Sequence, residues 1–291
     1  MASLKEIRAR ISSVASTQKI TNAMKMVSAA KLKKAEATNL KFVPYKTKLS
    51  ESLTNYLSSA GDCNIPLSEH RDIKRVALMV FSSNSGLCGV FNSNINKLFK
   101  SAYESYEKSI GRENIMVFAV GKKFNDYLKR VGLTAEKAYL EIGEKPNYED
   151  ACEISDMFIE MFLHQKVDKV ELIYNHYKNT GIQIPQREVV LPISTDIENG
   201  TSNNTFDYIV EPSKDEFINE LVPKVLRTTF FSTLLDSYTS EQGARTTAMH
   251  IASDNAEALS QELKIQYNKA RQEVITNELI DIVGGAEALK G

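Results

Sequence analysis

SLKEIRARISSVASTQKITNAMKMVSAAKLKKAEATNLKF, residues 3–42, contains neither glycine nor proline and is rich in alanine, lysine and arginine. These residues favour a helix, and Pro44 is the first residue that disfavours one. At 1.5 Å of rise per residue, the stretch predicts a helix roughly 60 Å long. A helix of this length needs a partner along which to bury an apolar side.

The apolar residues of this helix follow the helical period. They form two stripes, the second slightly rotated from the first: Leu4, Ile7, Ile11 and Val14, then Ile20, Met24 and Val27. The helix is also strongly basic, because residues 1–48 contain eleven Lys and Arg but only Glu6 and Glu36 as acids. The whole chain has a formal net charge of −1. This asymmetry predicts a partner with phosphate groups or with an acidic protein surface.

A second long helix is predicted between residues 215 and 283. Pro223 lies near its start, Gly243 is its only interior glycine, and the glycines at 284–285 are expected to end it. Its predicted apolar stripe comprises Leu226, Phe230, Leu234, Tyr238, Ile251, Leu259, Leu263, Tyr267, Ile275, Leu279 and Ile282. The two terminal helices can bury their stripes against each other, which predicts a long antiparallel coiled coil.

The middle of the chain alternates short apolar runs with amphipathic helical patterns. Strands are predicted at 75–81, 114–120, 169–175 and 187–193, and helices near 91–107, 122–131 and 148–164, with a polar loop at 195–207. This alternation predicts a doubly wound, mostly parallel α/β domain inserted between the two helices. The predicted divisions are 1–60 for the N-terminal long helix, 70–205 for the α/β domain and 208–291 for the C-terminal long helix.

The chemistry that a doubly wound domain often carries is missing from the sequence. No G-x-x-x-x-G-K-[ST] or G-x-G-x-x-G motif occurs, and the nearest candidate is SSNSGLCG, residues 82–89. Its glycines could place backbone N–H groups around a phosphate, or Ser85 or Cys88 could act as a nucleophile. The simpler interpretation is a tight turn between a strand and a helix.

The three cysteines and four histidines are scattered and match no disulfide framework or zinc-ligand spacing. Three functions stay open: a nucleotide-dependent α/β enzyme, a basic coiled coil that binds nucleic acid, and a basic coiled coil that faces acidic protein surfaces. The basic helix lacks aromatic side chains that would stack on bases before Phe42, which favours protein contacts.

Two terminal blocks resemble a known family. They are IRARISSVASTQKITNAMKMVSAAKLKKAE (7–36) and NAEALSQELKIQYNKARQEVITNELIDIVGGAEAL (255–289). Both closely resemble the terminal signatures of the γ subunit of F-type ATP synthases of the bacterial type. Between them, SGLCGVFN (85–92) resembles the family's Gly-Leu-Cys-Gly turn and FDYIVEPS (206–213) resembles its Tyr-Glu-Pro segment.

The resemblance implies a central-stalk rotor subunit that couples proton flow through the membrane sector to ATP synthesis or hydrolysis. ATP is then made and hydrolysed on β subunits, so the chain is expected to be non-catalytic and to hold no cofactor or metal. The implied partners are the α3β3 ring, the ε subunit and the membrane c-ring, with no nucleic acid. The implied location is the cytoplasmic face of the bacterial plasma membrane, with peripheral attachment through the c-ring only.

The resemblance also assigns candidate contact residues by their positions in the family's motifs. Contacts with β are expected at Met24, Lys25, Met26, Arg245, Arg271, Gln272 and Thr276. Contacts with the c-ring and ε at the foot are expected at Tyr208 and Glu211. This chain departs from the family pattern at Val210 and at Val90 and Phe91. No cysteine follows Cys152, which argues against the thiol regulation of chloroplast members.

Overall fold

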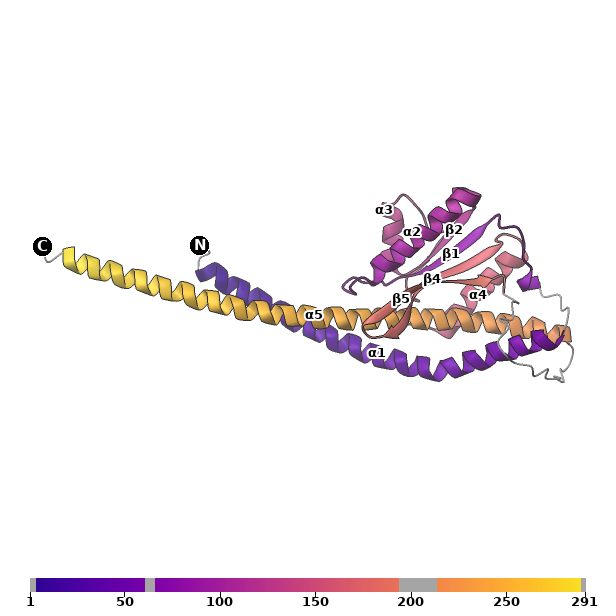
Figure 1. The fold of residues 1–291 in the computed structure, drawn as a ribbon, viewed down its shortest axis with the longest axis horizontal. Coiled ribbons are helices and arrows are strands. Elements are labelled where there is room, and N and C mark those ends of the chain that lie inside the picture. The colour runs from indigo at the N-terminus through magenta and orange to yellow at the C-terminus, as the bar shows by residue number, and fades with distance from the viewer. Residues whose placement is uncertain (1–3, 61–65, 194–213, 289–291) are drawn as a thin grey trace. The chain divides into compact units, whose positions relative to one another are not determined.

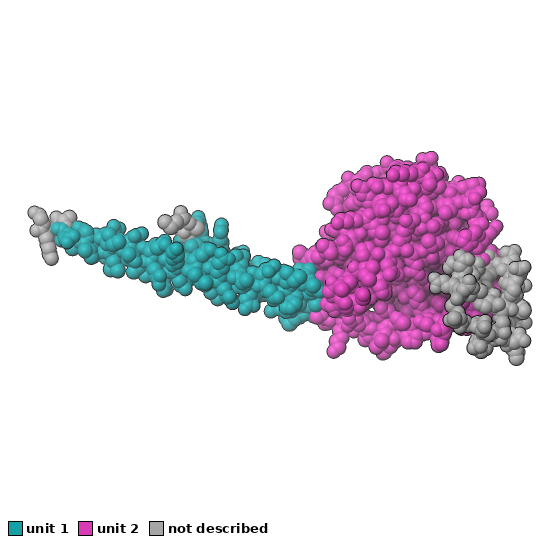
Figure 2. Space-filling model, in the orientation of Figure 1, with its two compact units in different colours: residues 1–28, 246–291 teal, residues 29–245 magenta. Residues whose placement is uncertain are grey.

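The computed structural model describes residues 4–60, 66–193 and 214–288. The chain divides into two compact units: unit 1 comprises Met1–Ser28 and Thr246–Gly291, and unit 2 comprises Ala29–Arg245 (Figure 2). Two long helices, α1 (Leu4–Ala60) and α5 (Lys214–Ala288), contribute residues to both units (Figure 1). The predicted fold class, long terminal helices with an α/β domain inserted between them, is confirmed.

Unit 2 contains a five-stranded sheet in the order β3-β2-β1-β4-β5. Its strands are β1 (Val76–Phe81), β2 (Ile115–Val120), β3 (Lys137–Tyr139), β4 (Lys169–Asn179) and β5 (Ile182–Leu191). The first four are parallel to their neighbours, and β5 is antiparallel to β4. The predicted mostly parallel sheet is therefore correct. Strand β3 was not predicted, because it has only three residues, two of them exposed, and no apolar run marks it.

Helices α2 (Phe91–Ile110), α3 (Lys122–Arg130) and α4 (Tyr148–Leu163) complete the domain, with short 3-10 turns at Pro66–Ser68 and Arg112–Asn114. Alternate residues of β1 point to opposite faces of the sheet. Leu78 packs in the cluster formed with α2 and α3. Met79 packs in the cluster that contains α4 and the α5 residue Phe230. The sheet therefore uses one face to hold the long helices.

Ring contacts set the direction in which α1 and α5 pair within unit 2. The Phe42 and Phe231 ring centroids are 4.9 Å apart, and those of Tyr56 and Phe217 are 5.0 Å apart. Because higher numbers on α1 meet lower numbers on α5, the helices are antiparallel, as predicted. Helix α1 also continues through Pro44, which was expected to interrupt it. Proline removes one backbone hydrogen bond, but Phe42 and Leu49 remain packed on either side of it.

Large parts of the predicted apolar stripes are wrong. In unit 1, Ile20 is 61% and Val27 is 57% exposed, whereas their neighbours Thr21 and Ser28 are buried. Buried positions of α5 in the same unit follow steps of four and three: Met249, Ser253, Ala256, Ser260 and Leu263. These buried positions, which form the seam between α1 and α5, repeat every seven residues. A stripe drawn at 3.6 residues per turn gradually rotates away from such a repeat. The seam residues are mostly small, so they permit close approach of the two helices.

The same correction applies to the predicted α5 stripe. Leu226, Phe230, Leu234 and Leu263 are buried as predicted, whereas five other members are exposed: Ile251, Leu259, Ile275, Leu279 and Ile282. The glycines at 284–285 do not end α5 either, since it runs to Ala288. Glycine lowers helix propensity by only about 1 kcal/mol, which does not forbid a helix. Cys63, the predicted loop at 195–207, and Tyr208, Val210 and Glu211 lie outside the described residues.

Candidate functional site

The first candidate surface is the α1 portion of unit 1 around the predicted contact residues. Met24 and Lys25 are half-buried, whereas Met26 is 64% exposed. The exposed side chains of Ile20 and Val27 lie on the same helical segment. This segment therefore presents large apolar side chains to the outside, while hydroxyl-bearing Thr21 and Ser28 fill the seam. An exterior more apolar than the adjoining seam is typical of a surface that a partner covers.

The second candidate surface is the C-terminal portion of α5. Every residue from Arg271 to Glu287 is exposed, including the predicted contact residues Arg271, Gln272 and Thr276. The Thr276 hydroxyl donates to the Gln272 carbonyl (2.8 Å), so it is engaged with its own helix. Six large aliphatic residues on this stretch are 40–67% exposed: Val274, Ile275, Leu279, Ile280, Ile282 and Val283. The stretch therefore exposes several large aliphatic side chains that no described residue covers.

Arg245, also predicted as a partner contact, lies in a different environment within unit 2. Its side chain is buried, and Nη1 lies 2.6 Å from Oε1 of Glu241, which is buried as well. Its Nη2 donates to the Ser85 hydroxyl (2.9 Å) and carbonyl (3.3 Å). Burial raises the pKa of Glu241, although Arg245 and Lys31 act in the opposite direction. Arg245 thus joins α5 to the loop that follows β1.

This contact changes the interpretation of the glycine-containing loop at 82–89. The Ser85 oxygens accept hydrogen bonds from a cation, whereas a phosphate would need donors. Gly121 has a positive φ of 91°, and a Cβ on it would lie 2.2 Å from the Ser82 carbonyl oxygen. The carboxyl ends of β1 and β2 are therefore in close backbone contact. In doubly wound folds ligands bind at this edge, and here α5 itself lies against the β1 loop.

Cys88 does not have the environment of a reactive thiol. The side chain is 2% exposed, and its Sγ accepts a hydrogen bond from Asn92 Nδ2 at 3.2 Å. Burial raises the pKa of the Cys88 thiol, with Ser83 acting in the opposite direction. Because the thiolate is the nucleophile, a raised pKa lowers reactivity. The Ser83 hydroxyl donates to the Ser85 carbonyl (2.7 Å), so this cluster serves the turn.

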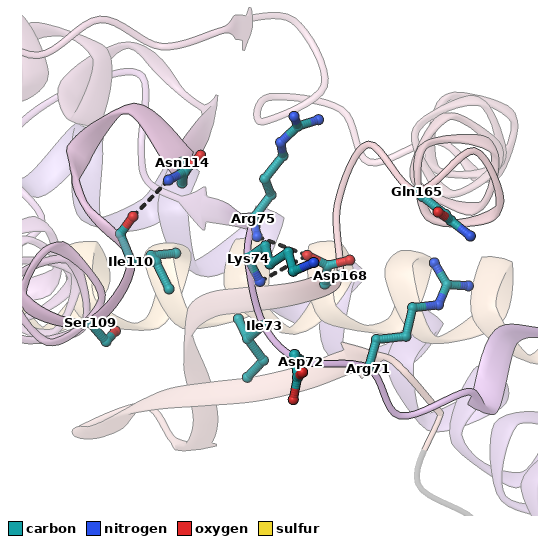
Figure 3. A pocket seen from close by; sticks show the side chains of 10 residues that line it. All are labelled: Arg71, Asp72, Ile73, Lys74, Arg75, Ser109, Ile110, Asn114, Gln165 and Asp168. Atoms are coloured by element: carbon teal, nitrogen blue, oxygen red, sulfur yellow. Dashed lines mark hydrogen bonds between the residues drawn. The ribbon is translucent and has the colours of Figure 1, made fainter.

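A cavity of about 730 Å³ lies at the other end of the strands, where β1, β2 and β4 begin (Figure 3). Its walls include Arg71, Lys74, Arg75 and Asp168. Asp168 Oδ2 accepts the backbone N–H groups of Lys74 and Arg75, both at 2.9 Å. The ends of α2 and α4 contribute here, and the negative ends of helix dipoles disfavour an anion. The basic side chains are therefore explained as local charge compensation rather than as a nucleotide site.

Within 4–60, 66–193 and 214–288, no three His, Cys, Asp or Glu side chains gather as metal ligands. Over the same ranges, no helix combines the length and the apolar composition that a membrane crossing requires. Both candidate surfaces lie in unit 1.

Comparison with known proteins gives matches over the full length. The family model described as ATP synthase matches residues 3–289. The ATP synthase gamma chain of Phocaeicola vulgatus is 47% identical over 290 residues, covering 99% of this chain and all of the relative. That of Bacteroides fragilis is 47% identical over 293 residues, with coverage of 99% and 100%.

Solved structures agree with these relatives. A chain in the central stalk and c-ring structure of Tetrahymena thermophila mitochondrial ATP synthase matches with a TM-score of 0.59 and 25% identity, covering 80% of this chain and 99% of that one. A chain of the Euglena gracilis mitochondrial enzyme has a TM-score of 0.69 at 18% identity, with coverage of 98% and 94%. The second likeness concerns the fold alone.

Proposed function

The chain belongs to the family of ATP synthase γ chains, the non-catalytic central-stalk subunits, and from this premise we propose how its surfaces act in the rotor. The observation that carries the proposal is the match to γ chains over essentially the whole length of both proteins. The chain associates with the rest of an ATP synthase, which is a membrane-associated complex. Catalysis takes place on the β subunits of that complex.

We propose that unit 1 is inserted in the α3β3 ring and that its exposed apolar side chains are covered there. An asymmetric shaft contacts three chemically identical β subunits differently, so each β subunit is held at a different point of its open-to-closed equilibrium. Rotation exchanges these states among the three subunits. Because binding linkage is reciprocal, nucleotide occupancy on β also biases the angle of the shaft. The same chain can thus serve synthesis driven by protons and pumping driven by ATP.

The charge of α1 supports an acidic partner surface on β. Lys25 is half-buried beside the exposed Met26, so its charge lies at the border of the seam and the outer surface. Two opposite charges 4 Å apart interact by roughly 4 kcal/mol at an effective dielectric of about 20. Met24, Lys25 and Met26 are the proposed contacts for an acidic β lever. Arg271, Gln272 and Thr276 are proposed to contact other β loops from the uncovered helix.

Arg245 is also a proposed β contact, but we propose that the residues around it, rather than its own guanidinium, touch β. Its guanidinium is already bonded to Glu241 and Ser85, so a direct contact would require those bonds to rearrange. The ε subunit and the c-ring are the remaining proposed partners, with Tyr208 and Glu211 at the foot. The proposed location is the cytoplasmic face of a bacterial plasma membrane, attached through the c-ring.

Co-purification from native membranes tests the proposed assembly. A tagged copy of the chain should recover α, β and ε together with the c-ring in fixed stoichiometry after detergent extraction. Recovery of the chain alone, or with nucleic acid in place of these subunits, would contradict the proposal. In addition, calorimetric titration of the purified chain with Mg-ATP should give no micromolar binding, and such binding would favour a nucleotide-dependent enzyme.

Charge changes on α1 test the contact with the lever. Lys25→Glu should replace attraction by repulsion, and Met24→Lys should strengthen the grip on an acidic lever and raise the barrier between dwell angles. Substitution at one helix surface position usually changes folding stability by about 0.5 kcal/mol or less, so both variants should assemble. The ratio of ATP-driven proton pumping to hydrolysis, or its activation energy, should change. Wild-type behaviour of both variants in assembled complexes would exclude the contact.

A further inference from the structure

The β4–β5 hairpin extends beyond the rest of the sheet. Strand β4 pairs with β1 only as far as Ile173, whereas its pairing with β5 continues to Asn179. The turn is fixed by Asn179, whose Oδ1 accepts the backbone N–H groups of Gly181 (3.0 Å) and Ile182 (2.8 Å). The hairpin is thus an ordered two-stranded ribbon that projects from the domain. The long helices receive its tip within unit 2.

On α5, the hairpin contacts one face at two points. Asp236 Oδ2 lies 2.6 Å from His176 Nδ1, and Asp236 Oδ1 accepts the backbone N–H of Tyr177 at 3.0 Å. Seven residues later, and therefore on the same face, a Cβ on Gly243 would lie 3.0 Å from Tyr177 Cε2 and 3.6 Å from the Cα of Thr180. Because Gly243 has no side chain, it leaves a notch on α5, and the Tyr177 ring lies against this notch.

On α1, the same tyrosine reaches a carboxylate. The Tyr177 hydroxyl donates to Glu36 Oε1. Glu36 is the only acidic residue between Ile7 and Lys48, a stretch otherwise rich in lysine and arginine. The one acid of this basic stretch therefore lies at the position that meets the hairpin. The ring of Tyr177 lies on α5 while its hydroxyl binds α1, so one side chain joins the α/β domain to both long helices.

We propose that Tyr177, Glu36 and Gly243 form a clasp that transmits torque between the α/β domain and the paired helices, an inference that rests on the proposed rotor function. A torque applied to the domain must cross its contacts with α1 and α5. The hairpin tip is held on both helices, by Asp236 and the Gly243 notch on α5 and by Glu36 on α1. Tyr177 is therefore a positioning residue for coupling, with no part in the chemistry on β.

The test compares coupling in complexes reconstituted into vesicles. Tyr177→Phe keeps the ring in the Gly243 notch and removes the hydroxyl, and Glu36→Ala removes the acceptor while retaining a good helix former. The clasp is closed when the hairpin tip is bound to α1 and open when it is not. Loss of a hydrogen bond to a carboxylate should lower the ratio of closed to open clasp by about tenfold. The ratio of proton pumping to ATP hydrolysis should fall at least about twofold in each variant, and the double variant should be no worse than either, because the two residues act as one contact.

Tyr106→Phe is the matched control. It removes a hydroxyl that also donates to a buried carboxylate, that of Glu171, but on α2 within the α/β domain. It should lower domain stability and leave the coupling ratio at the wild-type value. The clasp is wrong if Tyr177→Phe and Glu36→Ala complexes of normal subunit composition couple like the wild type. It is equally wrong if Tyr106→Phe lowers the ratio as much as they do.

The wild-type complex separates failure of the clasp from failure of the proposed function. If the chain does not assemble with the other subunits, or if the wild-type complex hydrolyses ATP without pumping, the rotor function itself fails. If the wild type pumps and Tyr177→Phe pumps equally well, only the clasp fails. Subunit composition on native gels, measured for every variant before the vesicle assay, makes these cases distinct.

Discussion

Two stretches of the same helix, α5, reverse the usual relation between polarity and burial. Between Ser232 and Arg245, in unit 2, only Tyr238 is not buried, although most residues there are polar. Between Arg271 and Glu287, in unit 1, every residue is exposed, although the stretch includes six large aliphatics. Polarity alone therefore does not say which part of a helix the chain itself covers.

The difference lies in what surrounds each stretch. The buried stretch lies among α1, the β4–β5 hairpin and the β1 loop, where small hydroxyl side chains permit close packing. Among them, the Thr239 hydroxyl bonds within its own helix by donating to the Leu235 carbonyl at 2.7 Å. The exposed stretch has no such neighbours among the described residues. Its aliphatic surface is what a protein interface requires and what a helix in water does not.

Two leucines on α5 provide the largest expected contrast. Leu234 is 4% exposed and Leu279 is 57% exposed. Leu234→Ala should lower the free energy of unfolding of the isolated chain by about 2–5 kcal/mol, because it leaves a cavity in the core. Leu279→Ala should change it by no more than about 0.5 kcal/mol. Urea denaturation measures both, and similar losses in the two variants would contradict the comparison.

The buried carboxylate of Glu171 provides a second contrast, through pH. Burial alone would raise its pKa, but hydrogen bonds from Arg187, Tyr106 and Lys169 outweigh burial and lower it. A lowered pKa stabilises the folded state above the unfolded value of about 4.3, and this stability is lost as pH falls through the folded pKa. Glu171→Gln should cost about 1–3 kcal/mol at neutral pH.

The Glu171→Gln variant should also lose less stability than the wild type on acidification below about pH 4.3. Urea titrations of both proteins between neutral and acidic pH measure this difference directly. Parallel curves for the two proteins would show that another carboxylate dominates. Because the cluster joins α2, β4 and β5, the variant should leave the coupling ratio of assembled complexes unchanged.

Two glycines on α5 should respond in opposite directions, with the smallest expected effects. Gly284→Ala meets no atom within 4 Å, so the gain in helix propensity should stabilise the last turns by up to about 1 kcal/mol. Gly243→Ala gains the same propensity, but its methyl would lie 3.0 Å from the Tyr177 ring. Overpacking costs about 1–3 kcal/mol, so net destabilisation is expected. Thermal unfolding and amide exchange near residue 284 distinguish the two, and stabilisation by Gly243→Ala would exclude a tight notch.

The sequence predicted the fold well, because long periodic helices and apolar strands carry strong local signals. It did not predict which stripe becomes the seam, since Thr21 and Ser28 are buried only because two helices approach closely there. It also gave no signal for the hairpin contacts. Tyr177 and Gly243 are far apart in sequence, and only the tertiary structure brings them together. The isolated position of Glu36 in the basic stretch 7–48 was visible in the sequence, but its partner was not.

The sequence could name candidate surface residues, but it could not show whether their side chains are accessible in the folded chain. Exposure identifies Met26 and the stretch from Arg271 to Glu287 as accessible. The structure also shows that Arg245, predicted from the family motif as a partner contact, is hydrogen-bonded to Ser85 within its own unit. A family motif shows where a residue lies along the chain. Whether its side chain is free to contact a partner depends on the bonds that it already makes in the folded chain.

Amide hydrogen exchange of α5, measured in the isolated chain and in the assembled ATP synthase, tests the central comparison most directly. In the isolated chain, amides between Ser232 and Arg245 should be strongly protected, and those between Arg271 and Glu287 should exchange close to the rate of a fraying helix. In the assembled complex, both stretches should be protected, because partner subunits cover the second. Equally fast exchange of residues 271–287 in both states would contradict the account, since their apolar surface would then remain uncovered in the machine.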